Sequence, residues 1–436
     1  MSNDNFTGVA LICDPGADPW YESGRGLLSN EVPFRPDLNL RQPESIEKRL
    51  ALKLARKGVR AALCALIANL IYAYARAANT RVFYSRNRNH YAELVRRYSP
   101  SYYTFANMMA AVASLEEAGL IEHEKTAPSP NAICRSRIRA TAALLNLLGD
   151  LSPDLVITPR EEIILRDAAK RHRDYSDTER ICAMRKDVIA HNEFLACADI
   201  RVDHPSARYD EGGFLRVQDR WLDPRRRTYY RVFNCDWNRG GRWYGPFWQG
   251  LSNRFRKHLR IDGEAVVELD YRACHLRLLC ASSGIELPCH EEDYDPFKVP
   301  GIARRKLKLA FNIMLNADSE VSARRAIVCE LTTEGLARPY DEAADLMEAV
   351  RSSFPGLERF WCSRAGLCLQ NIDADICARV QRRLRRRDIP ALSIHDSFIV
   401  PVRGSDVLQA VRHEEMARAC RRLASNGLTG GKQTLK

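Results

Sequence analysis

The spacing of apolar residues changes from a strand period to a helix period within residues 266–279. Residues 266–269 are β-branched or apolar, except for one Glu, and predict a strand that ends at Asp270. From Leu276 the apolar positions recur at i, i+3 and i+4, which predicts a helix that begins near Arg272. The pattern therefore places a carboxylate at a strand–helix junction, a rigid position for a metal ligand.

A second Asp occupies a similar position near the C-terminus. Residues 391–401 form two short apolar runs around His395-Asp396-Ser397, which predicts a β-hairpin with polar residues at its turn. If this hairpin pairs with the first strand, Asp270 and Asp396 lie close together. Two Mg²⁺ ions that catalyse nucleotidyl transfer need such carboxylates. Taken singly, each Asp is more typical of a cap or a turn, and the surrounding segments favour the metal site.

Between these two segments, residues 301–317 predict a helix with one polar face. Arg304 and Lys308 are i, i+4 neighbours, and Asn312 and Asn316 continue the same face. A face that is basic at its N-terminal end suits a triphosphate, because the Arg fork binds oxygens in pairs and Lys adds a point charge. The alternative is a solvated face of an ordinary amphipathic helix.

In this order, the three segments resemble motifs A, B and C of family A DNA polymerases and single-subunit phage-type RNA polymerases. Asp270-Tyr271 resembles the start of motif A, Arg304 and Lys308 keep the Arg-x-x-x-Lys of motif B, and His395-Asp396-Ser397-Phe398 resembles motif C. The resemblance implies that Asp270, Asp396 and the backbone carbonyl of Tyr271 bind two Mg²⁺ ions, with Mn²⁺ as an alternative. It also implies that Arg304 and Lys308 bind the nucleoside triphosphate and act in catalysis.

Two further segments resemble parts of the same polymerases that contact nucleic acid. Residues 240–260 resemble the Gly-Arg…Gln-Asn-Ile-Pro segment before motif A, and residues 370–376 resemble the Gln-Gly-x-Ala-Ala-Asp segment before motif C. The resemblance implies contacts with primer and template from Arg242, Gln249, Arg254, Gln370 and His395.

The chain departs from these families at the two positions that contact the sugar. His275 replaces the motif A Glu, and Asn316 replaces a Tyr eight residues after the motif B Lys. We expect His275, Asn312 and Asn316 to lie beside the nucleotide. The choice between deoxyribonucleotides and ribonucleotides stays open.

Residues 45–150 resemble a winged helix, in which a helix enters the major groove of DNA and a hairpin contacts phosphates. Thr104 opens a helix that Gly119 ends, and two strands follow at residues 120–125 and 133–141. Arg135 and Arg137 alternate along the second strand, so we expect them to bind DNA. A small subdomain that only packs on the core is the alternative, since an edge strand also carries positive charge to avoid aggregation.

These patterns predict a mixed α+β fold, with an antiparallel palm sheet, helical fingers and a helical thumb. The expected division is an extended arm at 1–44, the winged-helix-like domain at 45–150, a helical thumb-like region at 151–215, palm and fingers at 216–425, and a flexible tail at 426–436. The thumb-like region rests on helices predicted at 159–173 and 177–197.

The composition favours a nucleic-acid partner. The net charge is +12, which attracts a polyanion, and arginine runs at 225–227 and 382–387 are candidates for phosphate contact or for plain solvation. The 14 cysteines include no Cys-x-x-Cys pair and predict reduced, mostly buried thiols in a cytoplasmic protein. The apolar run 61–75 is too short to cross a membrane and predicts a core helix.

We therefore expect a template-directed polymerase, of DNA polymerase or primase type, from a plasmid, phage or mobile element. Its partners would be a DNA template, a primer and nucleoside triphosphates, with no membrane. One alternative is a replication initiator or regulator that binds DNA and whose polymerase-like half is inactive. Another is template-independent nucleotide addition, which needs the same residues.

Overall fold

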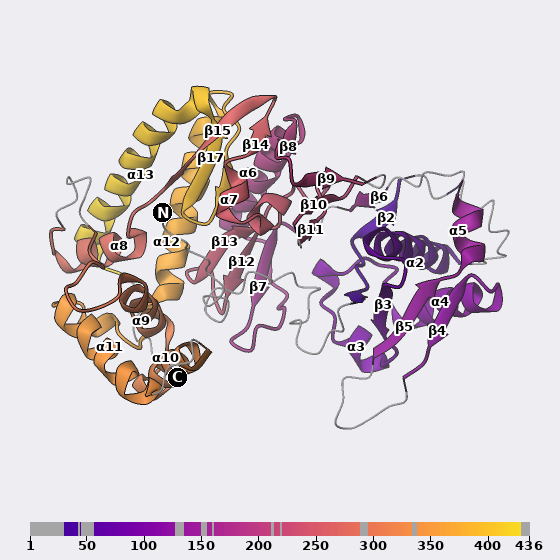
Figure 1. The fold of residues 1–436 in the computed structure, drawn as a ribbon, viewed down its shortest axis with the longest axis horizontal. Helices are drawn as coiled ribbons and strands as arrows, with labels where there is room; N and C mark the ends of the chain where they lie inside the picture. Colours follow the sequence, from indigo (N-terminus) through magenta and orange to yellow (C-terminus); the bar gives the residue numbers. More distant parts are fainter. Residues whose placement is uncertain are drawn as a thin grey trace.

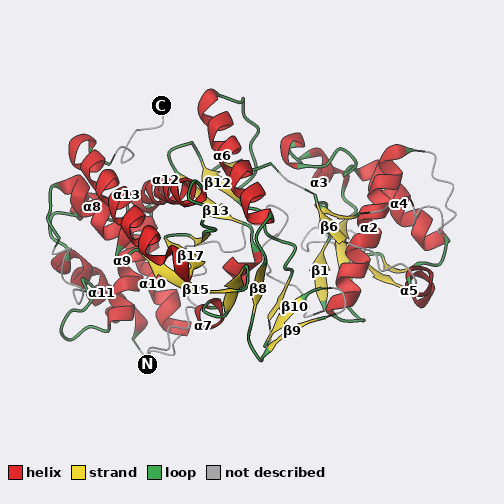
Figure 2. Cartoon of the chain, turned by 90° about the horizontal axis from the view of Figure 1, so that it is seen from above, coloured by secondary structure: helices red, strands yellow, loops and turns green. Residues whose placement is uncertain are grey.

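The mixed α+β class is confirmed, with 49% of the chain in helices and 19% in strands. The computed structural model describes residues 30–41, 44, 56–126, 135–149, 155–158, 161–210, 213–218, 220–287, 295–333 and 338–428. Figure 1 shows two lobes with a small sheet between them, and Figure 2 shows the same separation from above. That linking sheet has the order β11-β10-β9, with strands β9 (Ala207–Tyr209), β10 (Leu215–Val217) and β11 (Arg220–Leu222).

The N-terminal lobe packs helices against a four-stranded sheet with the order β1-β3-β5-β4. The strands are β1 (Glu31–Pro33), β3 (Arg81–Ser85), β4 (Ile121–Glu124) and β5 (Arg135–Ala140), and a separate pair is formed by β2 (Leu38–Leu40) and β6 (Leu155–Ile157). The helices are α2 (Lys57–Arg76), α3 (Arg88–Ala92), α4 (Phe105–Glu117) and α5 (Ala142–Leu148), with the 3₁₀ turn η2 (Arg96–Tyr98). The predicted helix and hairpin of this region are both present.

Local signals mark the ends of α4 as the sequence predicted. The Thr104 side chain accepts a hydrogen bond from Asn107 N at 3.3 Å, which caps the helix start. Gly119 follows the helix with φ +67°, a conformation that glycine adopts without strain. Residues 45–55, at the start of the predicted winged-helix-like domain, and residues 127–134, between its two predicted strands, lie outside the described residues.

The extended arm predicted for residues 1–44 is wrong where the structure describes it. Residues 31–33 and 38–40 form β1 and β2, and Val32, Phe34 and Leu38 are buried in the core of the N-terminal lobe. β1 pairs in parallel with β3, which lies about 50 positions later in the chain. Prolines obscured these short apolar runs in the sequence. Residues 1–29 of the predicted arm and residues 429–436 of the predicted tail lie outside the described part of the chain.

Helix α2 is longer than the apolar run that predicted it. At 20 residues it is long and apolar enough to cross a membrane by length and composition, the one such helix among the described residues. Of its most apolar 18-residue window, 61% is buried inside the protein. Leu63, Leu66 and Ile67 are completely buried in the N-terminal core, as expected of a core helix.

The C-terminal lobe contains the two sheets that position the candidate site. The five-stranded sheet, with the order β16-β17-β15-β14-β8, is antiparallel throughout: β8 (Ile200–Val202), β14 (Leu259–Ile261), β15 (Glu264–Asp270), β16 (Leu392–Ile394) and β17 (Ser397–Pro401). The three-stranded sheet consists of β7 (Ile163–Arg166), β12 (Tyr230–Asn234) and β13 (Gly240–Tyr244).

Helices cover these sheets and extend the lobe to one side (Figure 1). They are α6 (Glu179–Ala196), α7 (Asn253–Arg256), α8 (Cys274–Ser283), α9 (Arg304–Asn316), α10 (Glu320–Thr333), α11 (Pro339–Ser353), α12 (Ala365–Arg385) and α13 (Ser405–Asn426), with 3₁₀ turns η3 (Phe247–Gly250), η4 (Glu358–Phe360) and η5 (Val402–Gly404). α9, α10 and α11 pack on one another, and α13 packs on α8 and α12.

The helical thumb-like region predicted for residues 151–215 is wrong in most of its length. Residues 155–157 pair with β2 in the N-terminal lobe, and residues 163–166 form β7, which pairs in parallel with β12. Of the two predicted helices, α6 alone is present. The segment Ile163-Ile164-Leu165 is buried on both faces of the sheet, and such a short apolar run does not distinguish a strand from a helix.

The N-terminal lobe contacts the three-stranded sheet, and the segment that follows it, through η2. The Arg97 guanidinium forms ion pairs with Asp174 (3.0 Å), Asp177 (3.3 Å) and Glu161 (3.4 Å). The Tyr98 hydroxyl donates to the Arg173 carbonyl at 2.8 Å and accepts from the backbone N–H of Leu165 at 3.0 Å. These contacts fix the position of the N-terminal lobe relative to β7.

A buried hydroxyl holds the β16 end of the five-stranded sheet. Tyr229 Oη accepts from Trp248 Nε1 at 2.9 Å and from Ser393 N at 2.7 Å, and it donates to the Ser393 carbonyl at 2.9 Å. The Tyr229 side chain is 1% exposed, so no solvent replaces these bonds if the hydroxyl is removed.

We predict that Tyr229→Phe lowers the free energy of unfolding by about 1–3 kcal/mol, because it leaves buried polar groups of Trp248 and Ser393 unsatisfied. Urea denaturation followed by circular dichroism measures the change. Tyr340→Phe is the matched control, since Tyr340 is 63% exposed. Equal stability of the two variants would contradict this role of the hydroxyl.

Candidate active site

The pairing of β15 with β17 brings Asp270 and Asp396 together, as the sequence predicted. Asp270 lies opposite Ser397 in the antiparallel register, and Asp396 immediately precedes Ser397 in the hairpin turn. The backbone N–H of Tyr271 donates to the Asp396 carbonyl at 3.3 Å, so the two segments stay in contact beyond the last strand pair. Two segments that are distant in the sequence thus meet at one end of the sheet.

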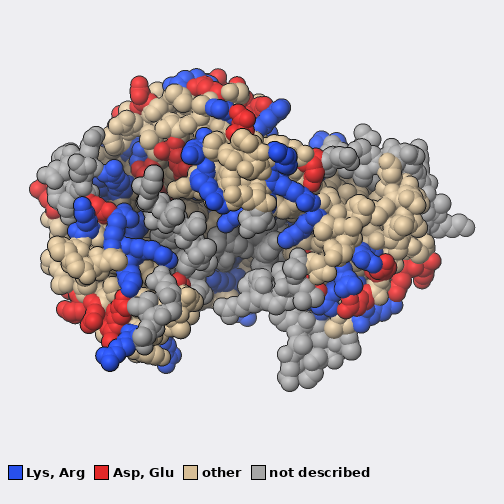
Figure 3. Space-filling view, in the orientation of Figure 1, with Lys and Arg blue, Asp and Glu red and all other residues tan. Residues whose placement is uncertain are grey.

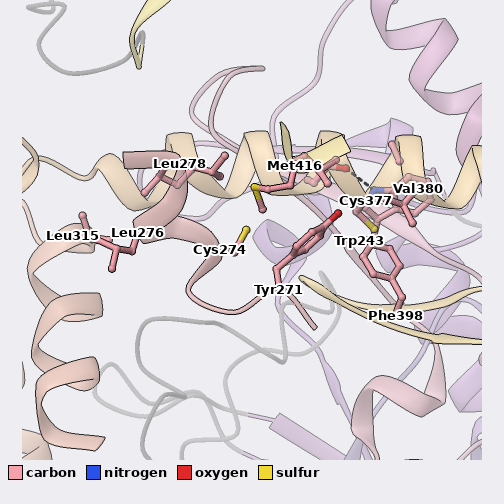
Figure 4. Close-up of a cluster of buried hydrophobic side chains, with 14 of the residues drawn as sticks. Trp243, Tyr271, Cys274, Leu276, Leu278, Leu315, Cys377, Val380, Phe398 and Met416 are labelled. Carbon is pink, nitrogen blue, oxygen red and sulfur yellow. Dashed lines mark hydrogen bonds between the residues drawn. The ribbon is translucent and has the colours of Figure 1, made fainter. Parts of the chain in front are cut away.

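Both segments turn sharply at this end of the sheet. His395 has φ +58° in the hairpin turn, and Ala273 has φ +49° just before α8. Non-glycine residues in this left-handed region are strained and persist only where surrounding structure fixes them. Figure 4 shows Tyr271 within the buried cluster, with Cys274 on one side and Phe398 on the other. The buried Tyr271 ring anchors the strand–helix junction that carries Asp270.

Three polar side chains form a buried cluster next to Asp396. Asp373, on α12, is 3% exposed and forms an ion pair with Arg242 of β13 at 2.6 Å. His275 Nε2 lies 2.8 Å from the same Asp373 oxygen. Burial would raise the pKa of Asp373, but Arg242 and His275 hold it below its usual value. Asp373 is therefore a carboxylate that two partners already bind.

The charge state of the hairpin turn follows from this environment. Burial raises the pKa of Asp396, and the negative charge of Asp373 adds to the increase, while Arg242 and His275 oppose it. Burial also lowers the pKa of His395 to about 3, so its imidazole is neutral at pH 7. Asp396 is partly buried, and a cation that bound to it would relieve its unfavourable negative charge.

The donor set fits a divalent ion of the Mg²⁺ type. The residues that the structure describes include no group of three or more His, Cys, Asp or Glu side chains placed to bind a metal. Mg²⁺ does not need such a cage, because it keeps waters and binds through one or two carboxylates and the substrate phosphates. Asp270, Asp396 and the Tyr271 carbonyl could supply this smaller set of oxygens. A closed zinc site would need ligands that these residues do not provide.

Helix α9 has the polar face that the sequence predicted. Arg304, at its first turn, is exposed, and Lys308, Asn312 and Asn316 follow it, all partly buried. An acidic side chain also binds this face, since Asp295 forms an ion pair with Arg304. Partial burial would raise the pKa of Asp295, but Arg304, the backbone N–H of Phe297 and the charge of Lys308 hold it below its usual value. A phosphate group that bound to Arg304 and Lys308 would therefore have to displace Asp295.

Several residues predicted to contact nucleic acid are engaged inside the protein. Arg242 and Gln370 are each 8% exposed. The Gln249 amide donates to the carbonyls of Trp243 (3.0 Å) and Ser393 (3.2 Å) and accepts from Gly245 N, which joins β13 to β16. Arg254 is exposed and donates to Gln218. Of this set, Arg254 has the most accessible cation.

The arginines of the N-terminal hairpin lie on an inner strand, not on an edge. β5 is flanked by β3 and β4, and Arg137 forms ion pairs with Glu31 and with Glu124, the latter at 3.4 Å. The Arg135 guanidinium lies 4.5 Å from the centre of the Phe83 ring. α4, the helix expected to enter the major groove, contains no Lys or Arg. Exposed arginines of this lobe include Arg86, Arg88 and Arg96 around α3 and η2, and Arg56 and Arg60 at the start of α2.

The two arginine runs also have partners within the fold. Arg227 donates to the carbonyls of Leu195 and Ala198 at the end of α6. In the second run, Arg382 and Arg385 bind Asp187 of α6, both at 3.1 Å. Arg383 binds Glu414 (2.6 Å) and Glu415 (3.2 Å) of α13. These four side chains connect segments of the fold, whereas Arg386 and Arg387 are exposed.

Figure 3 shows Lys and Arg side chains over the α9 region and along the border between the two lobes on this face of the molecule.

No family model matches the chain, and no curated protein matches it in sequence.

Sequence reasoning missed two residues beside the carboxylates. Asp373 lies in the segment 370–376 that resembles part of a polymerase, but a single Asp within a helical pattern gives no signal that it is buried. Glu268 precedes Asp270 on the same face of β15, where it accepts from Ser397 Oγ at 2.7 Å and pairs with Arg256 at 2.8 Å. Alternation along the strand could have identified Glu268.

We predict that Asp396→Asn raises the melting temperature at pH 7 without divalent ions. A carboxyl group whose folded pKa is raised destabilises the fold progressively as pH rises from its unfolded value of 3.8 through the folded value. The gain over wild type should therefore be small near pH 4 and larger at pH 7. Differential scanning calorimetry across this range measures it, and a gain that does not depend on pH would contradict the stated cause.

Proposed function

We propose that this protein is a template-directed nucleic-acid polymerase, of DNA polymerase or primase type, that joins nucleotides by two-metal chemistry. The observation that supports this most is the β15–β17 pairing, which brings Asp270 and Asp396 to one end of an antiparallel sheet. The basic face of α9, in the same lobe, supports a triphosphate as the substrate. The resemblance to motifs A, B and C concerns these same three elements.

In this proposal Asp270, Asp396 and the Tyr271 carbonyl hold the ions. Mg²⁺ bound there would lower the pKa of the attacking hydroxyl and neutralise the departing pyrophosphate. Arg304 and Lys308 bind the triphosphate and stabilise the charge that develops on it. Neutral His395, in the turn beside Asp396, offers a hydrogen bond to nucleic acid and no charge.

The sugar would lie near His275 and Asn316, at the two positions where the chain differs from the resembled families. Asp373 holds His275 by its Nε2 atom, and Asn316 donates its amide to the Asn312 carbonyl at 2.8 Å. A Cβ at Gly366 would clash with the Asn316 side chain, so α12 packs directly against it. The side chains of His275 and Asn316 are therefore both held by neighbouring residues. An extension assay must offer deoxyribonucleotides and ribonucleotides separately.

The proposal predicts extension of a labelled primer–template by the wild type with Mg²⁺ and one of the two nucleotide sets. Asp270→Ala/Asp396→Ala should lower the rate about 10³-fold or more, the equivalent of several kcal/mol of transition-state stabilisation. Glu264→Gln, at the opposite end of β15, is the matched control and should retain activity. Unprimed single-stranded DNA, tested in parallel, separates a primase from a primer-dependent polymerase.

The alternative is a DNA-binding initiator or regulator whose polymerase-like half is inactive. The burial of Arg242 and Gln370 favours it, because both residues would contact nucleic acid in an active enzyme of the resembled families. DNA contact by the N-terminal lobe would then involve Arg86, Arg88 and Arg96 rather than α4. No extension under any condition, with duplex binding intact in the double variant, would favour this alternative.

If α9 binds the triphosphate, Asp295 competes with it for Arg304. We predict that Asp295→Asn lowers the KM for nucleotide about two- to fivefold, the equivalent of losing a partly exposed ion pair. Glu320→Gln, which removes one of the two acidic partners of Arg351 on α11, is the control and should leave KM unchanged. A KM that rises in Asp295→Asn would contradict competition and indicate that Asp295 orders the site.

A further inference from the structure

The peptide group between Asp270 and Tyr271 is bound at both ends. Its N–H donates to the Asp396 carbonyl at 3.3 Å, and its carbonyl oxygen, that of Asp270, accepts from the Arg412 guanidinium. This peptide joins the residue that supplies one carboxylate to the residue that supplies the backbone carbonyl. Rotation of the peptide plane would move both groups, and these two hydrogen bonds oppose that rotation.

Arg412 reaches this peptide from α13, and it contacts Tyr271 in two further ways. Its guanidinium lies 4.7 Å from the centre of the Tyr271 ring, and its own carbonyl accepts from Tyr271 Oη at 2.9 Å. The Arg412 side chain therefore binds the backbone next to Tyr271, and the Tyr271 side chain binds the backbone of Arg412. This reciprocal contact joins α13 to the end of β15.

The energetic cost of this arrangement argues against a purely structural role. Arg412 is 8% exposed, and its Nε atom has no hydrogen-bond partner among the described residues. Burial lowers the pKa of Arg412, and the nearby Tyr271, Asp270 and Asp396 partly offset this decrease. An apolar side chain of similar length would fill the same space without a buried charge and is often the more stable choice.

We propose that Arg412 is a positioning residue that fixes the Asp270–Tyr271 peptide and thereby the oxygens that bind divalent ions. This inference rests on the proposed function, because it assigns Arg412 to the same site. A fixed peptide matters there, since a functional constellation tolerates deviations of only about 0.5 Å. The planar fork also explains why Arg suits the position, because Lys cannot stack flat on Tyr271 while it donates to the carbonyl.

The charge of Arg412 and its geometry predict opposite effects on metal affinity, which makes the proposal testable. A positive charge near Asp270 and Asp396 repels a divalent cation, so an effect of charge alone would make Arg412→Met bind Mn²⁺ more tightly. A positioning effect predicts the reverse. We expect the Kd for Mn²⁺, measured by isothermal titration calorimetry, to rise about tenfold or more in Arg412→Met and by less in Arg412→Lys.

A second measurement does not depend on metal. Hydrogen–deuterium exchange of a peptide that covers residues 266–276 should be at least about tenfold faster in both variants, because Tyr271 N–H loses its fixed geometry. Arg418→Met, on the exposed face of α13, is the matched control and should change neither measurement. Arg412→Lys keeps the test valid if Arg412→Met does not fold.

The outcomes separate this inference from the proposed function. If wild type binds Mn²⁺ and the Arg412 variants bind it equally well or more tightly, with unchanged exchange, the positioning role is wrong and the metal site stands. If wild type binds no Mn²⁺ but the variants exchange faster, Arg412 fixes the peptide and the metal site is wrong, which overturns the proposal as stated.

Discussion

The hydrogen bond from Tyr271 N–H to the Asp396 carbonyl closes the ladder between β15 and β17 at the end where both chain segments turn away. Everything proposed for the site depends on this ladder, because a shift of one residue would send each side chain of β15 to the other face of the sheet. The register is held from several directions. Phe398 and Tyr271 pack in the core below it, Tyr229 binds β16 from one side, and α13 closes the other side.

Buried charge is concentrated around this ladder. Asp373 is compensated by Arg242 and His275, and Glu268 by Arg256, so each of these carboxylates has a cation of its own. Asp396 differs, because burial and Asp373 raise its pKa and oppose its ionisation. A folded protein tolerates such a group at a cost to stability, and a bound cation would remove that cost. This contrast distinguishes the site from the ion pairs that connect helices elsewhere in the lobe.

Local sequence patterns predicted the elements of the site and failed where the partner of a segment is distant. The strand before Asp270, the hairpin around Asp396, the helix of Arg304 and the Thr104 cap all follow from residues within one element. Residues 163–166 form a strand because they pair with β12, which lies far along the chain. The burial of Arg242 depends on Asp373, which lies 131 positions away. The role proposed for Arg412 depends on the Asp270–Tyr271 peptide, and Asp270 lies 142 positions away. No periodicity within a segment contains that information.

The measurement that tests the central claim most directly is single-nucleotide incorporation on four primer–templates that differ only in the first template base. Each is offered one nucleotide at a time, with Mg²⁺, as deoxyribonucleotide and as ribonucleotide. A template-directed polymerase adds only the complementary nucleotide in each case, so four different products result. Addition of the same nucleotide to all four templates would show template-independent synthesis, and no addition to any of them would contradict a catalytic role for Asp270 and Asp396.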